Sequence, residues 1–102
     1  MTSRRTKMTK KEILDYLALR KDEFRQKYGV EKIGLFGSYA RDEATESSDI
    51  DIFVYMPPSF DHLAELKYTI EEDLKKSVDV SINHKRIKPI FLKLINKDIC
   101  YV

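Results

Sequence analysis

The chain has 102 residues, of which 42% are hydrophobic and 35% charged, and its formal net charge is +2 at pH 7. This length suits one domain, because a chain of about 100 residues buries roughly two-thirds of its unfolded surface but cannot build two good cores. The small net charge gives no strong case for nucleic acid or a membrane as partner. No segment approaches the ~18 apolar residues that span a bilayer, and the N-terminus lacks the apolar centre of a secretory signal. Since the single Cys100 can form no intramolecular disulfide, we expect a cytoplasmic protein.

The first part of the chain is expected to be a basic tail followed by a long helix. Residues 1–8 are polar and basic and are typical of a flexible tail, with contact to nucleic acid as the alternative. The segment Thr9–Glu12 has the pattern of a capping box, and Gly29 is a common helix stop. Apolar residues recur between them at helical spacing, which predicts a helix over 10–28. The folded domain is therefore placed at 9–102.

The later elements alternate between strands and helices. In chain order they are a strand near 31–36, a short helix from Ser38, a polar loop at 43–48, a strand over 49–55, a long helix after Pro58, a strand over 77–82, a helix from Pro89 and a terminal strand at 99–102. This order predicts an α/β (α+β) fold, a small mixed sheet with helices packed on one face. The other face is expected to carry an acidic active site.

The most informative pattern joins a Gly-Ser turn to a pair of acids. Gly37 and Ser38 are followed, after ten residues, by Asp49-Ile50-Asp51. Because a strand alternates faces, the two aspartates point the same way, roughly 6.5 Å apart at their Cα atoms. Carboxylate oxygens suit Mg²⁺, and two such ions roughly 3.5–4 Å apart can stabilise the attacking and leaving oxygens of a phosphoryl displacement. Gly37 lets backbone approach a phosphate, and Ser38 offers a hydroxyl and the amides of the turn it starts.

Each half of this pattern also has an ordinary interpretation. Gly-Ser is a common loop dipeptide, and an acid-Ile-acid alternation is common in antiparallel strands that have one face exposed to solvent. The occurrence of both in one chain, after a predicted strand and at this spacing, favours a functional site.

Asp79 adds a third carboxylate. In the strand over 77–82, Val78 and Val80 are expected to face the core and to leave Asp79 on the other side. If that strand neighbours the one that carries Asp49 and Asp51, three carboxylates converge, and they repel one another unless a cation lies among them. The alternative is an isolated acid that faces solvent.

These residues resemble the minimal nucleotidyltransferase (MNT) family of the DNA polymerase beta superfamily, over about residues 10–102. The resemblance rests on Gly37-Ser38-Tyr39-Ala40-Arg41, the Asp49-x-Asp51 pair, Val78-Asp79-Val80 and the closing Ile99-Cys100-Tyr101-Val102. It implies a polymerase beta-like nucleotidyltransferase fold. It also implies a reaction in which a hydroxyl attacks the α-phosphorus of ATP and pyrophosphate leaves.

The resemblance assigns roles to individual residues. The implied catalytic and metal-binding residues are Asp49, Asp51 and Asp79, which would hold two Mg²⁺ ions, and the implied phosphate-binding residues are Gly37, Ser38 and Arg41. For Arg41 the alternative is a solvated side chain. The family often has Gly after this arginine, whereas this chain has Asp42, which either repels triphosphate or ends the short helix differently.

The resemblance also implies a partner. MNT proteins are typically paired with HEPN-domain ribonuclease toxins, so the implied function is an antitoxin that transfers AMP from ATP to a hydroxyl, expected on a tyrosine, of such a toxin. Larger superfamily members grip the acceptor with extra domains, and here we expect the partner to supply that surface. Two alternatives stay open, an antitoxin that acts by binding alone and a stand-alone transferase that acts on a small molecule or a nucleic-acid end. The basic cluster Lys85, Arg86 and Lys88 is either solvated surface or a region that steers the nucleotide.

Overall fold

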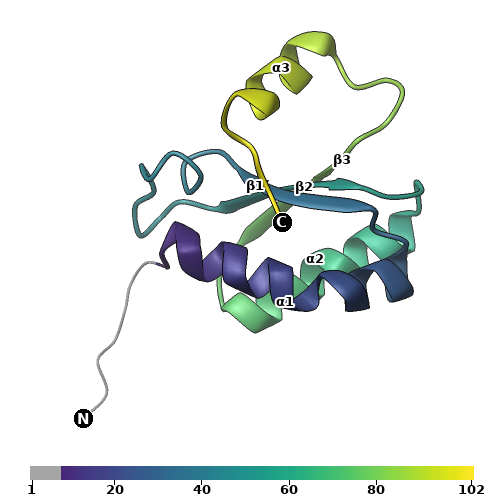
Figure 1. Ribbon diagram of the computed structural model, residues 1–102, viewed down its shortest axis with the longest axis horizontal. Helices are drawn as coiled ribbons and strands as arrows, with labels where there is room; N and C mark the ends of the chain where they lie inside the picture. Colours follow the sequence, from purple (N-terminus) through teal and green to yellow (C-terminus); the bar gives the residue numbers. More distant parts are fainter. Residues whose placement is uncertain (1–7) are drawn as a thin grey trace.

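The computed structural model describes residues 8–102 (Figure 1). The predicted basic tail therefore lies outside the described residues, except for Met8, which packs against the core. The elements are α1 (Lys10–Tyr28), β1 (Lys32–Phe36), β2 (Ile50–Tyr55), α2 (Phe60–Leu74), β3 (Val78–Ile82), α3 (Pro89–Asp98) and β4 (Cys100–Tyr101). No helix among the described residues is long and apolar enough to cross a membrane.

The four strands form one mixed sheet in the order β3-β2-β1-β4. β2 pairs antiparallel with β1 and parallel with β3, and the short β4 pairs antiparallel with β1. The register places Asp51 opposite Phe36 on one side and opposite Asp79 on the other. Since paired residues share a face of the sheet, the two aspartates lie side by side on one face.

The opposite face of the sheet is covered by α1 and α2, which lie together below it in Figure 1. Ile50, Ile52 and Val54 of β2 are fully buried on this face, as are Leu17 of α1 and Leu66 of α2. Burial of each such side chain contributes about 1.5–3 kcal/mol, which makes this layer the main source of stability. The predicted fold class is confirmed, with the long helices on one face and the acids on the other.

The third helix differs from the two long ones. Figure 1 shows α3 on the far side of the sheet from α1 and α2, where it leads into β4 at the edge. Gly34 of β1 leaves room for this segment, because a Cβ on it would lie 2.9 Å from both Ile99 Cγ1 and Tyr101 Cδ1. Phe53, which is opposite Gly34 in the register, and Ile95 of α3 are also buried. The acid face therefore carries a small apolar layer of its own, and the prediction that helices pack on one face holds for α1 and α2 only.

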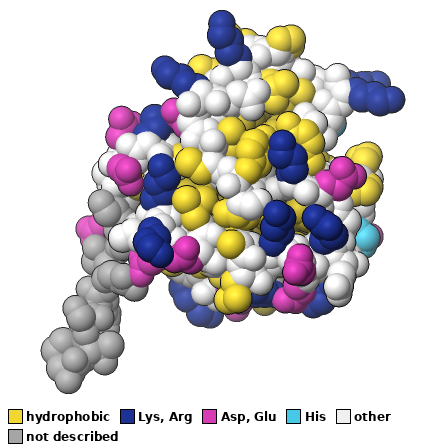
Figure 2. Space-filling view, in the orientation of Figure 1, with side chains coloured by type: hydrophobic (Ala, Val, Ile, Leu, Met, Phe, Trp, Pro, Cys, Tyr) yellow, Lys and Arg dark blue, Asp and Glu magenta, His cyan; other side chains and the backbone are white. Residues whose placement is uncertain are grey.

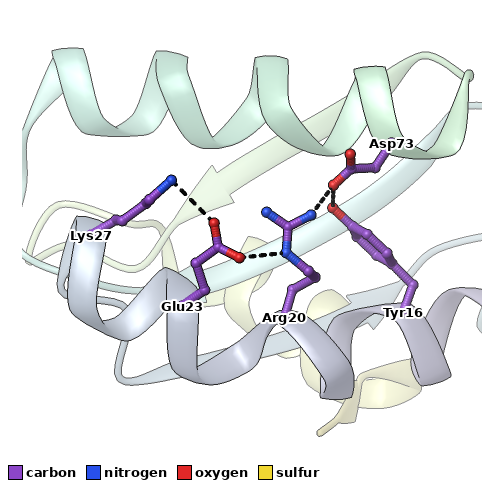
Figure 3. Close-up of polar contacts among 5 residues, drawn as sticks. All are labelled: Tyr16, Arg20, Glu23, Lys27 and Asp73. Carbon is purple, nitrogen blue, oxygen red and sulfur yellow. Dashed lines mark hydrogen bonds and ion pairs between the residues drawn. The ribbon is translucent and has the colours of Figure 1, made fainter.

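A polar network joins α1 to α2 at the surface (Figure 3). The hydroxyl of Tyr16 donates to the Asp73 carboxylate of α2, and the Arg20 guanidinium binds the same carboxylate. Arg20 also donates to Glu23 at 2.8 Å, and Lys27 Nζ lies 3.1 Å from Glu23. Partial burial, followed by the hydrogen bond to Asp73, raises the pKa of Tyr16 above its ordinary value. The ion pairs are partly exposed and so contribute modestly, but the network fixes one helix against the other.

Candidate active site

The turn after β1 is held directly against the acid pair. Gly37 has a φ of 79°, in the left-handed region that favours glycine. A Cβ on Gly37 would overlap Oδ2 of Asp51 and lie 3.0 Å from its Cγ. Glycine is therefore required at this position for two reasons, its positive φ and the close approach of the Asp51 carboxylate. The two halves of the sequence pattern meet at this contact.

The predicted short helix from Ser38 is wrong, because residues 38–42 form a single closed turn. Its bonds are Arg41 N–H to Gly37 O at 3.1 Å, Asp42 N–H to Tyr39 O at 3.3 Å and Glu43 N–H to Ser38 O at 2.8 Å. The last two bonds form the Schellman pattern that ends helices, with Asp42 at the left-handed position and a φ of 59°. Glycine is usual there, and aspartate tolerates it better than most residues. Asp42 thus ends the helical conformation after a single turn, and the chain continues toward β2.

The three predicted acids lie at one end of two neighbouring strands. Asp51 is half-buried on β2 and faces Asp79 of β3 in the register, and Asp49 lies one residue before β2. Burial raises the pKa of the Asp51 carboxyl above its usual value, and the carboxylates of Asp79 and Asp49 raise it further. The charges of Asp79 and Asp49 therefore act on the Asp51 carboxyl.

The donor chemistry of this group fits a hard cation. All three side chains offer only carboxylate oxygens, the donors that Mg²⁺ prefers, and a cation would relieve their mutual repulsion. Among residues 8–102, however, no group of three or more His, Cys, Asp or Glu side chains is arranged to hold a metal ion. The register places Asp51 beside Asp79, whereas Asp49 precedes β2, and both Asp49 and Asp79 are exposed. The predicted three-ligand arrangement stays a prediction.

Arg41 is exposed, but its guanidinium also has defined ionic partners. Its Nη1 donates to Asp98 at the end of α3 at 2.9 Å, and its Nε donates to Glu43 at 2.9 Å. These hydrogen bonds, first Glu43 and then Asp98, raise the pKa of Arg41. The Arg41 charge partly opposes the rise in the pKa of Asp51, which remains above its usual value. Asp98 escaped the sequence analysis because it lies 57 residues from Arg41 in the chain, in no motif.

The comparisons with known proteins agree on one protein family. Residues 18–99 match the family model described as a nucleotidyltransferase domain. The protein MJ0126 of Methanocaldococcus jannaschii, provisionally named a protein adenylyltransferase, is 40% identical over 96 residues, which cover 92% of this chain and 98% of that protein. The protein adenylyltransferase MntA of Thermococcus cleftensis is 37% identical over 97 residues, which cover 93% and 97% of the two chains.

A solved structure has the same fold. It contains a tri-AMPylated HEPN toxin of Shewanella oneidensis in complex with an MNT antitoxin, and the matching chain superposes with a TM-score of 0.65. The match covers 91% of this chain and 71% of that chain at 18% sequence identity. At that identity the likeness concerns the fold alone.

Proposed function

The chain belongs to the nucleotidyltransferase domain family, and from that premise we propose that it is an antitoxin that transfers AMP from ATP to a tyrosine hydroxyl of a HEPN ribonuclease toxin. One observation carries the proposal. The turn at Gly37 packs against the Asp51 carboxylate, and Asp51 faces Asp79 across the strand pair. A backbone turn suited to phosphate thus adjoins the carboxylates that a nucleotidyl transfer needs.

Each group has a role in the proposed reaction. Asp49, Asp51 and Asp79 would hold two Mg²⁺ ions, which when bound supply positive charge to the attacking and leaving oxygens. Gly37 and Ser38 bind the β- and γ-phosphates through backbone and hydroxyl groups. Asp79 accepts the proton of the acceptor hydroxyl, whose oxygen bonds to the α-phosphorus while the bond to the β-phosphate breaks and pyrophosphate leaves. The chain contributes mainly by positioning these groups.

The relatives support a protein acceptor. MntA of Thermococcus cleftensis is named a protein adenylyltransferase, and this chain spans nearly all of its length. The Shewanella oneidensis structure holds an AMPylated HEPN toxin beside its MNT antitoxin. By analogy we infer a HEPN toxin as partner of this chain and ATP as donor.

One observation favours a second candidate, an antitoxin that neutralises its toxin by binding alone. Within residues 8–102, the three acids are not arranged so that they could together hold a metal ion. A chain that had lost catalysis could keep the same fold and the same partner surface. The two candidates differ in whether AMP is transferred.

The test is AMP transfer to the protein encoded by the neighbouring reading frame. We expect label from ATP labelled at its α-phosphorus to appear on that protein when Mg²⁺ is present, and to be absent with a chelator or with Asp51→Asn. That variant removes one of several mutually repelling carboxylates, so it is expected to stay folded. No label from the wild-type chain, with toxicity still neutralised in cells, would favour the binding-only candidate.

A further inference from the structure

The surface beyond Asp79 contains a hollow that the proposed catalytic roles leave unused. Ser81 lies two residues after Asp79 on the same face of β3, and it lines this hollow together with Ile87 and Phe91. The hollow has a volume of about 460 Å³, within the range of about 300–1,000 Å³ that is usual for ligand clefts. It lies between the end of β3 and the start of α3.

The segment that contributes most of the lining of this hollow is strongly basic, and two of its cations, Arg86 and Lys88, line the hollow itself. Residues 83–97 contain no Asp or Glu and five basic side chains, which are Lys85, Arg86, Lys88, Lys93 and Lys97. None of the five makes an ion pair with a carboxylate of residues 8–102. The whole chain carries only +2, so this charge is local. Several Lys and Arg side chains that lie close together without an ion pair favour binding to an acidic partner.

Apolar side chains lie among these cations. On α3, Ile90 is 63% exposed, Phe91 39% and Leu94 59%. Figure 2 shows hydrophobic and Lys or Arg side chains gathered over the upper part of the molecule, where α3 lies. An apolar area rimmed by charge is typical of a protein interface. Two of the three side chains are aliphatic, whereas single-stranded nucleic acids are usually bound on aromatic platforms.

The position of the hollow fits the acceptor side of the reaction. The Gly37 turn follows β1 and lies on one side of Asp51, whereas Asp79 lies on the other side, on the edge strand β3. The hollow begins further along β3, away from the Gly37 turn. Phosphates held at that turn and a molecule in the hollow would therefore approach the acid pair from different sides.

We propose that this hollow is the acceptor subsite, and that it takes an extended, acidic segment of the partner protein that carries the acceptor hydroxyl. The inference rests on the proposed function and names the surface that this chain contributes to it. Ile87 and Phe91 pack against the aromatic ring of the acceptor, and Arg86 and Lys88 bind carboxylates that flank it. A ring held there directs its hydroxyl toward Asp79.

Charge reversal tests this subsite. The variant Arg86→Glu/Lys88→Glu is compared with Arg25→Glu/Lys67→Glu, which makes the same charge change at exposed residues of α1 and α2 on the other face. The probe is the protein encoded by the neighbouring reading frame. We expect the first variant to raise the KM for that protein about tenfold and to leave the KM for ATP unchanged, and the second to change neither.

The other outcomes are informative in distinct ways. A wild-type chain that transfers no AMP defeats the proposed function. A wild-type chain that transfers AMP, with the KM for the partner unchanged by Arg86→Glu/Lys88→Glu, defeats the acceptor subsite alone. A raised KM for ATP, or loss of single-stranded RNA binding with the partner KM unchanged, assigns the cations to another ligand and also overturns the inference.

A crosslinking experiment locates the occupant. A photoreactive benzoyl-phenylalanine replaces Phe91 in the hollow or, as the control, Phe60 of α2, which is 85% exposed. We expect the group at position 91 to crosslink to the peptide of the partner that also receives AMP, and the group at position 60 to give no such product. A crosslink from position 91 to a different part of the partner would overturn the assignment.

Discussion

Replacement of Gly37 by alanine tests the contact between the phosphate turn and the acids. In Gly37→Ala, the new methyl group would overlap the Asp51 Oδ2 and lie 3.0 Å from Cγ and 3.2 Å from Cβ of that residue. The carboxylate has to move, because a methyl group cannot occupy this space. The change therefore acts on the carboxylate proposed as catalytic without removing it.

Two costs can be estimated from the structure. Alanine at a φ of 79° is strained by about 1–2 kcal/mol, and each kcal/mol lowers the melting temperature of a domain of this size by about 4–8 °C. A shift of about 1 Å in a reacting group can cost about 100-fold in rate. We therefore expect Gly37→Ala to melt about 5–15 °C below the wild type and to transfer AMP about 100-fold more slowly at temperatures where it is folded.

Gly29→Ala is the matched control. Gly29 has a φ of 74°, so the backbone strain is similar, and a Cβ on it would lie 3.1 Å from Pro57 Cδ, a milder contact than the overlap at Gly37. Gly29 caps α1, and the atoms nearest to a Cβ on it belong to Pro57. Melting curves and initial rates of AMP transfer are measured on both variants. A comparable melting shift with wild-type activity is expected for Gly29→Ala, and equal activity of the two variants would refute the role of the Gly37–Asp51 contact.

Three further changes test other parts of the structure. Asp42→Gly places glycine at a left-handed position and is expected to raise the free energy of unfolding in urea by about 0.5–1 kcal/mol; a decrease would contradict the proposed strain. Asp98→Asn removes one ionic partner of Arg41 and is expected to raise the KM for ATP several-fold with little change in kcat, whereas an unchanged KM would show that this pair does not position the arginine. Tyr16→Phe removes the hydrogen bond to Asp73 and is expected to cost about 1 kcal/mol. Because the pKa of Tyr16 is raised in the folded protein, the stability that its hydroxyl contributes is fully present below pH ~10 and is lost as the pH rises further. In urea unfolding at increasing alkaline pH, Tyr16→Phe should therefore lose less stability than the wild type. Equal losses in the two proteins would contradict the raised pKa.

The parts of the fold that were predicted correctly depend on local chemistry. The capping box of Thr9 and Glu12 and the left-handed Gly29 bound α1 through contacts within a few residues, and the structure has both. The alternation around Asp51 and Asp79 likewise follows from the period of a strand. Their register across β2 and β3 is consistent with the expected neighbouring strands.

The parts that were missed depend on distant contacts. The face on which α3 packs depends on the space left by Gly34 beside Ile99, which no local pattern encodes. The ion pair between Arg41 and Asp98 joins segments 57 residues apart. The turn at 38–42 ends early because Asp42 adopts a positive φ, and the sequence alone did not distinguish this from a short helix.

The most direct test of AMP transfer is the intact mass of the partner protein, purified from cells that co-express it with this chain. With the wild-type chain we expect the partner to gain one or more whole AMP increments, located on tyrosine by fragmentation. With Asp51→Asn, at equal expression and equal recovery of the complex, we expect an unmodified partner. An unmodified partner from cells with the wild-type chain, or an AMPylated one from cells with Asp51→Asn, would contradict the proposed nucleotidyl transfer.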